Sequence, residues 1–217
     1  MTPSINPQAI LIDLDGTLAN SLSVMYQAYQ KFLWQFNVEP TSTEFDSLNG
    51  PPLEEVVRRL KSTHSLRDDA YALHLNYFSL IDDLYTKVRP TAGAEALLLA
   101  AKDNHCSVGV VTSNSMKRTK EWLENVGLAH LVNFIISGDD VKNGKPDPEP
   151  YQLAAQHVNC PLSQIIAIED SLQGAKSAVD AGLRTFILTD CIEQQSLWPS
   201  GVQQITSLDF LVGLLWQ

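Results

Sequence analysis

Residues Ile10 to Leu18 read Ile-Leu-Ile-Asp-Leu-Asp-Gly-Thr-Leu, a stretch that predicts both the core of the fold and the place of the chemistry. The three apolar residues at its start, two of them β-branched, are typical of a buried strand. Asp13 and Asp15 follow at once, and a Gly-Thr pair then turns the chain. Ligands bind at the carboxyl ends of strands in open α/β sheets. We therefore expect Asp13 and Asp15 to converge on one ligand from a strand end and the loop after it.

Composition narrows the class of protein. The chain has 217 residues, with 15 Lys and Arg against 25 Asp and Glu, so its formal net charge is −10. This charge argues against a general surface for nucleic acid or for an anionic membrane. A hydrophobic fraction of 44% predicts a globular protein with a sizeable core. No apolar segment reaches membrane-spanning length and the first residues lack the features of a secretory signal, so we expect a cytoplasmic protein.

The alternation of apolar runs and helical patterns predicts an α/β fold. Five short apolar runs have the composition of strands, and helical patterns lie between the last four, as in a parallel sheet with crossover helices. A Ser cap at the start and a Gly at the end predict helices over residues 115–126 and 172–181. Leucines near the end of the chain suggest a closing amphipathic helix. The predicted strands are Ala9–Ile12, Val108–Val111, Phe134–Ile136, Ile165–Ile168 and Thr185–Leu188.

The stretch between the first two strands is far longer than the dozen or so residues that a crossover needs, which indicates an insertion. Apolar residues recur in it at helical spacing over residues 25–36, 53–60 and 68–85. We expect residues 21–87 to form a small helical domain, with residues 1–20 and 88–217 forming the catalytic core. The aromatic stripe of the first helix is expected to pack inside this domain.

Three further polar motifs accompany the first. Thr112-Ser113-Asn114 follows a predicted strand at a helix start, where these side chains and N–H groups either cap the helix or bind phosphate. Lys145 lies between a Gly and a Pro, in a loop that cannot continue a helix, and is either solvated or a fixed counter-charge. Glu169 and Asp170 follow another strand, where they cap the next helix or offer the hard oxygen ligands that Mg²⁺ prefers.

Taken in this order, the four motifs resemble those of the haloacid dehalogenase superfamily, whose members are mostly phosphatases and phosphomutases. The resemblance covers nearly the whole chain and implies a Rossmann-like parallel sheet with an inserted helical cap. The Gly-Lys-Pro-x-Pro and Glu-Asp-Ser-x-x-Gly segments are similar to the branch that contains phosphoglycolate phosphatase and β-phosphoglucomutase. The matching positions are Asp13-Leu14-Asp15-Gly16-Thr17, Thr112, Lys145 and Glu169-Asp170.

The resemblance implies a Mg²⁺-dependent phosphatase that hydrolyses a small phosphorylated metabolite, such as a sugar phosphate or a phosphoglycolate-like ester. Asp13 would attack phosphorus to form an aspartyl-phosphate, and Asp15 would protonate the leaving oxygen and then activate water. Asp13, Asp170 and the backbone carbonyl of Asp15 would hold the metal, and Glu169 would orient its water. The residues implied to bind substrate are Thr112, Ser113, Asn114, Lys145 and Gly50.

Three alternatives remain open at this point. A phosphomutase needs cap groups that hold a bisphosphate, and Met25 and Leu53 stand where β-phosphoglucomutase carries a histidine and an arginine. A dehalogenase would leave Asp15 without a task. A non-catalytic binding module on the same fold is possible in principle, because fold does not guarantee activity, but every motif position is filled.

The cap loop Gly50-Pro51-Pro52-Leu53 resembles the segment that faces the active site in phosphoglycolate phosphatase-like proteins. Three basic residues follow this loop, and we expect most of them to lie on a solvated helix face: Arg58, Arg59 and Lys61. The identity of the substrate stays open. A monomer or a weak homodimer is expected, with no nucleic-acid partner and no membrane partner.

Overall fold

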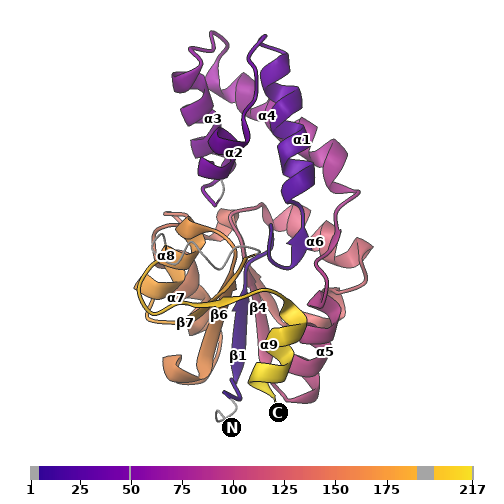
Figure 1. Ribbon diagram of the computed structural model, residues 1–217, viewed down its shortest axis with the longest axis vertical. Helices are drawn as coiled ribbons and strands as arrows, with labels where there is room; N and C mark the ends of the chain where they lie inside the picture. Colours follow the sequence, from indigo (N-terminus) through magenta and orange to yellow (C-terminus); the bar gives the residue numbers. More distant parts are fainter. Residues whose placement is uncertain (1–4, 49, 190–197, 217) are drawn as a thin grey trace.

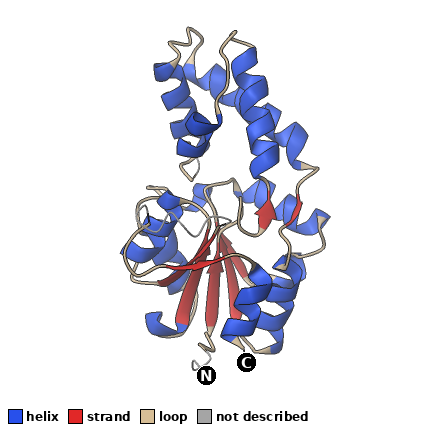
Figure 2. Ribbon diagram, viewed as in Figure 1, coloured by secondary structure: helices blue, strands red, loops and turns tan. Residues whose placement is uncertain are grey.

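The computed structural model describes residues 5–48, 50–189 and 198–216, and a six-stranded sheet lies at its centre in the order β5-β4-β1-β6-β7-β8. Every neighbouring pair is parallel. The chain moves outward from β1 on one side and returns to β6 on the other, so the direction of winding reverses at β1. Figure 2 shows the strands of this sheet in red, with blue helices on either side of them. The strands are β1 Ala9–Ile12, β4 Ser107–Val111, β5 Phe134–Ile136, β6 Ile165–Glu169, β7 Arg184–Leu188 and β8 Gln203–Ile205.

Helices cover both faces of the sheet, which explains why β1 is apolar throughout. Alternate side chains of a strand point to opposite faces. Ile10 and Ile12 belong to the cluster that contains residues of α5, α6 and α9, whereas Leu11 packs with residues of α7 and α8. All four residues of β1 are fully buried. The core helices are α5 Ala94–Asp103, α6 Met116–Asn125, α7 Glu149–Gln156, α8 Leu172–Asp180 and α9 Leu208–Leu215.

Four helices of the insertion lie above the edge at which the parallel strands end (Figure 1). Phe32 of the first helix stacks on Tyr77 of the fourth, with 4.7 Å between ring centroids, so the aromatic stripe is packed inside the helical unit as expected. The two chain connections to the sheet run side by side as a short antiparallel pair, β2 Ala19–Asn20 with β3 Arg89–Pro90. The helices are α1 Leu22–Trp34, α2 Ser42–Ser47, α3 Leu53–Thr63 and α4 Ala70–Tyr85.

The structure confirms the predicted α/β class and the five predicted strands, with ends that differ by one residue at most. Gly127 and Gly182 follow α6 and α8 with positive φ angles of 77° and 81°, as expected of helix stops. The sequence did not predict β8, because Gln203-Gln204-Ile205 has no apolar run. It also missed α2, β2 and β3, which are too short to show a period. Among the described residues, no helix is long and apolar enough to cross a membrane.

Candidate active site

Four polar motifs meet where the strands β1, β4 and β6 end, on both sides of the reversal point. Asp13 follows β1, Thr112 follows β4, and Asp170 follows β6. Lys145 enters from the loop between β5 and α7, and its Nζ atom lies 2.6 Å from Asp13 Oδ1. Parallel strands end at one edge of the sheet, so segments more than a hundred residues apart in sequence share one site.

Lys145 is the buried centre of this site. Its ammonium group donates to Asp13 Oδ1, to Glu169 Oε1 at 2.5 Å and to the carbonyl oxygen of Val111 at 3.0 Å. Three acceptors match the three N–H donors of an ammonium group. Burial of Lys145 opposes its charge, but the carboxylates of Asp13 and Glu169 raise its pKa above the usual value. Of the two roles that the sequence left open for Lys145, the solvated loop lysine is therefore wrong.

Asp13 is also shielded from water. Burial raises the pKa of its carboxyl well above the usual range, Lys145 lowers it, and the neighbouring charges of Glu169 and Asp170 raise it further. The net direction of this pKa is upward, because burial outweighs the lowering effect of Lys145. A cation placed among these carboxylates would relieve their repulsion.

Glu169 is held by groups that the sequence reasoning did not single out. Tyr151 donates its hydroxyl to Glu169 Oε1 at 2.8 Å, and Ser171 donates to Oε2 at 3.2 Å. A Cβ atom at Gly174 would lie 2.0 Å from Glu169 Oε1, so only glycine leaves room for this carboxylate. The glycine of the Glu-Asp-Ser-x-x-Gly segment was the available signal for Gly174. The sequence gave no such signal for Tyr151, because this residue lies in α7, outside the segment that contains Glu169 and Gly174.

Asp15 is fixed from both sides of the site. Tyr85, at the end of α4, donates to Asp15 Oδ1 at 2.7 Å, and Asn114 donates its side-chain N–H to Oδ2 at 3.1 Å. Burial raises the pKa of Tyr85 well above its usual range, and the charge of Asp15 adds to this effect. The Tyr85 hydroxyl therefore stays a donor. The sequence predicted Asn114 to bind substrate, whereas the structure places its amide against Asp15.

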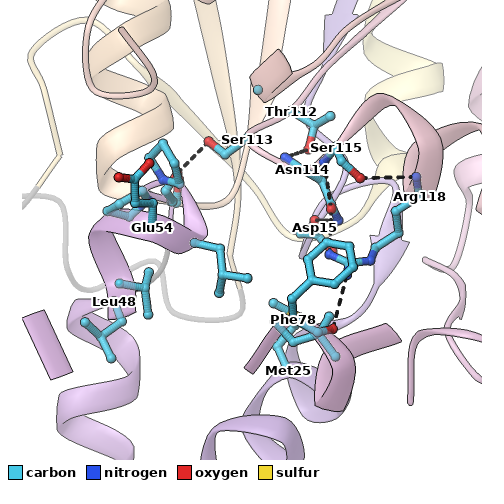
Figure 3. A pocket seen from close by; sticks show the side chains of 18 of the residues that line it. Asp15, Met25, Leu48, Glu54, Phe78, Thr112, Ser113, Asn114, Ser115 and Arg118 are labelled. Carbon is cyan, nitrogen blue, oxygen red and sulfur yellow. Dashed lines mark hydrogen bonds between the residues drawn. The ribbon is translucent and has the colours of Figure 1, made fainter. Parts of the chain in front are cut away.

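Arg118 of α6 joins these groups to the helical insertion. It donates to Asn114 Oδ1 at 2.9 Å and to Asp82 Oδ1 at 2.9 Å, and its guanidinium lies 4.3 Å from the ring centroid of Phe78. Figure 3 shows Arg118 and Asn114 beside Phe78, which comes from α4. The sequence gave no signal for Arg118, because its role depends on how α4 packs on the core.

The remaining predicted substrate residues line the same cavity in different ways. Thr112 is buried, and its Oγ1 atom accepts the backbone N–H of Asn114 at 3.0 Å, which leaves its hydroxyl hydrogen to be donated elsewhere. Ser113 instead donates its hydroxyl to the carbonyl oxygen of Gly50 at 2.8 Å. Ser113 and Gly50 thus form a contact between the core and the loop before α3.

Three carboxylates have the spacing of a metal site. Asp13, Glu169 and Asp170 each offer an oxygen, and these atoms lie within 4.8 Å of one another. A Cβ at Gly16, whose φ is +89°, would come within 2.1 Å of Asp170 Oδ2, so this turn needs glycine. Hard oxygen donors of this kind suit Mg²⁺. The carboxylate of Asp15 is not in this group, and the metal role that the resemblance implies for its backbone carbonyl stays a prediction.

The carboxylates open into a cavity of about 300 Å³ between the sheet edge and the helical insertion. Met25 and Leu53 both line it.

The side chain of Arg58 is 72% exposed, and both Arg58 and Arg59 pair with Glu55. Lys61 donates to the backbone carbonyl oxygens of Leu66 and Asp68, in the connection between α3 and α4. None of these three basic residues lines the cavity, as the sequence led us to expect for most of them.

Comparisons with known proteins agree with this geometry. Haloacid dehalogenase-like hydrolases match residues 10–188, and the chain belongs to this family. It is 30% identical over 190 residues to validoxylamine A 7'-phosphate phosphatase of Streptomyces hygroscopicus subsp. limoneus, covering 86% of this chain and 88% of that one. It is 26% identical to phosphoglycolate phosphatase of Neisseria meningitidis, covering 81% and 77%. The crystal structure of β-phosphoglucomutase from Clostridium difficile has the same fold, with a TM-score of 0.83, 20% identity, and coverage of 94% and 93%.

The close approach at Gly174 gives a prediction about stability. Helix propensity alone favours Ala over Gly by about 1 kcal/mol. Gly174→Ala should instead lower the free energy of unfolding by about 1–3 kcal/mol, because the new Cβ must displace a carboxylate that is held on several sides. Gly213→Ala, in α9 with open space around the position, should be neutral or stabilising. Urea unfolding measures both, and a stabilised Gly174→Ala variant would contradict the packing described.

The buried lysine gives a prediction about pH. Lys145→Met should cost about 3–5 kcal/mol at neutral pH, because it leaves buried carboxylates without their partner. Its loss raises the pKa of Asp13 further, and an acid with a raised folded-state pKa binds protons more readily in the folded chain, so stability is recovered as pH falls. The loss should therefore shrink from about pH 8 to about pH 5.

The matched control is Lys117→Met, at a side chain that is 77% exposed and lies 3.8 Å from Glu121. Its effect should stay within about 0.5 kcal/mol at every pH. Both variants are measured by urea unfolding in buffer with a chelator. A loss at Lys145 that equals the control, or that does not change with pH, would show that the lysine does not neutralise these carboxylates.

Proposed function

We propose that the chain is a phosphatase that hydrolyses phosphoric monoesters of small molecules through a phosphoenzyme. The observation that supports this most is the pairing of two differently held carboxylates at one cavity. Asp13 is fixed through one oxygen by Lys145, and Asp15, two residues later, is held by Tyr85 and Asn114. A nucleophile and an acid–base group are the two functions that such a reaction needs.

In the first step, Oδ2 of Asp13 attacks phosphorus, because Lys145 occupies Oδ1. The bond between phosphorus and the ester oxygen breaks, and Asp15 gives its proton to that oxygen, which leaves as an alcohol. In the second step, water attacks the phosphorus of the aspartyl-phosphate and gives a proton to Asp15. The bond to Asp13 breaks and inorganic phosphate leaves. Each step passes one proton through Asp15, so the enzyme returns to its starting state.

The other residues of the site stabilise charge. Lys145 offsets the negative charge on Asp13 and on the phosphoryl group, and Thr112 donates its hydroxyl to a phosphoryl oxygen. Glu169 holds Lys145 in place. Asp13, Asp170 and the carbonyl of Asp15 would hold Mg²⁺, and Glu169 would orient its water. When bound, the ion would neutralise the repulsion between carboxylate and phosphate.

The helical insertion supplies the rest of the enclosure. We propose that residues 21–87 act as a cap that covers the cavity and that residues 1–20 and 88–217 carry the chemistry. The contacts Ser113–Gly50 and Arg118–Asp82 support this division, because they join the two parts at the rim of the cavity. A cap that closes excludes bulk water and opens again for product release.

The nucleophile can be tested by one substitution. Asp13→Asn should lower kcat by at least about 10³-fold, because an amide is a poor nucleophile, while the fold survives. Acid quenching during turnover should trap an acid-stable, alkali-labile phosphate on the peptide that contains Asp13 in the unsubstituted enzyme. Asp180→Asn, at an exposed residue paired with Lys176, is the matched control and should keep full activity. Substantial turnover by purified, folded Asp13→Asn would remove Asp13 from its role.

The metal can be tested with and without turnover. A chelator should abolish activity and Mg²⁺ should restore it, because the cluster needs a cation beside Asp13. Isothermal titration calorimetry of the metal-free protein should show Mg²⁺ binding that Asp170→Asn weakens by at least about 10-fold. Unchanged activity in a sample shown by elemental analysis to hold no metal would contradict the assignment.

A further inference from the structure

The cavity has two unlike walls. The sheet side is polar and holds the carboxylates and Thr112, whereas the cap side is built from apolar side chains of α1, α3, α4 and the segment between α2 and α3. Figure 3 shows Leu48 and Met25 away from the polar cluster of the core, whereas Phe78 lies beside Arg118 at the margin of that cluster. Six of the side chains on the cap wall are Met25, Leu48, Leu53, Val56, Phe78 and Ile81.

Positive charge is scarce on this wall. Among the described residues that line the cavity, the basic ones are Arg118 and His74. Arg118 belongs to the core, its side chain is only 8% exposed, and it pairs with Asp82 at 2.8 Å. His74 stacks on Phe78. Glu54 and Asp139 add negative charge to the lining.

The start of α3 also offers little to an anion. It faces the cavity through Pro51, Pro52 and Leu53, and a proline has no N–H to donate. Glu54 and Glu55 occupy the first turn, where their charges offset the positive end of the helix dipole. An anionic group arriving at the cap wall would therefore lose its water, and among the described residues of that wall only His74 is basic.

We infer that the substrate is a monophosphate ester whose organic part carries no second anionic group and packs an apolar face against the cap. This inference rests on the proposed phosphatase function, because it assigns the phosphate to the Asp13 side of the cavity. Burial of apolar surface on the cap wall favours such a group. Bisphosphates and phosphorylated carboxylic acids are disfavoured, which also separates the chain from a phosphomutase that works through a bisphosphate.

Two esters that differ by one carboxylate provide the test. Benzyl phosphate and 4-carboxybenzyl phosphate have leaving alcohols of similar reactivity, because the carboxylate is remote from the bond that breaks. With Mg²⁺ present, kcat/KM for benzyl phosphate should exceed that for 4-carboxybenzyl phosphate by at least about 10-fold. Glucose 6-phosphate and 6-phosphogluconate form a second pair, and the ester without the carboxylate should again be preferred.

The substitution Leu53→Arg tests whether the cap wall causes the preference for esters without a carboxylate. It places a cation on the cap wall, so the ratio of the two kcat/KM values should shift by at least about 10-fold toward 4-carboxybenzyl phosphate. Leu53→Met keeps the wall apolar and should keep the original ratio. Ser62→Arg adds the same charge to an exposed position of α3 outside this cavity and should also leave the ratio unchanged.

The outcomes separate the two proposals. Equal or faster hydrolysis of the carboxylated esters by the unsubstituted enzyme would overturn the inference and leave the phosphatase function intact. Conversion of glucose 1-phosphate to glucose 6-phosphate in the presence of glucose 1,6-bisphosphate, faster than phosphate release, would overturn both the inference and the proposed phosphatase function, in favour of a phosphomutase. If the Mg²⁺-loaded enzyme released phosphate from none of these esters, nor from p-nitrophenyl phosphate, the proposed function itself would fail and the inference with it.

Discussion

The site depends on one buried cation, the ammonium group of Lys145. Asp13, Glu169 and Asp170 lie close together behind the sheet edge, and without a counter-charge their mutual repulsion would oppose folding. Lys145 donates to Asp13, to Glu169 and to a backbone carbonyl oxygen, so each of its three N–H groups has an acceptor. The same contact fixes the rotamer of Asp13 and leaves one oxygen for attack. The ion pair that offsets the repulsion among the carboxylates in the folded chain therefore also orients Asp13, the proposed nucleophile.

The reversal of winding at β1 explains why the predicted residues come together. Strands before and after β1 in the sheet end at the same edge, so their terminal loops surround one point. Asp13, Thr112 and Asp170 could be predicted because each follows a mostly apolar strand directly, and strand ends are visible in local sequence. Lys145 could be predicted only from its rigid neighbours and from its order among the other motifs.

Residues contributed by helices were not predictable in the same way. Tyr85, Arg118 and Tyr151 each lie on a helix whose sequence pattern shows which face is apolar, but not which partner that face meets. Tyr85 reaches Asp15 only because α4 ends beside β3, and Tyr151 reaches Glu169 only because α7 packs across the sheet. The roles of such residues depend on the angles and offsets between packed elements, which a single sequence does not encode locally. The same limit hid the contact between Asn114 and Asp15.

The polar and apolar walls of the cavity explain how an acidic chain could bind an anionic phosphate ester. A chain with a net charge of −10 has no general attraction for phosphate esters. Lys145 concentrates positive charge at the sheet edge, and a bound divalent cation would add to it, so the phosphoryl group meets a local positive site inside an acidic protein. Among the residues that the structure describes, the cap wall has no comparable charge and offers apolar contact instead. Under the proposed function, recognition of the phosphate and selection of the organic group would thus fall to different parts of the chain. The contacts of Arg118 and Tyr85 connect these parts, because they tie the packing of α4 to the position of Asp15. Under the proposed function, an organic group on the cap wall would therefore pack against α4, the helix whose last residue also holds the proposed acid in place.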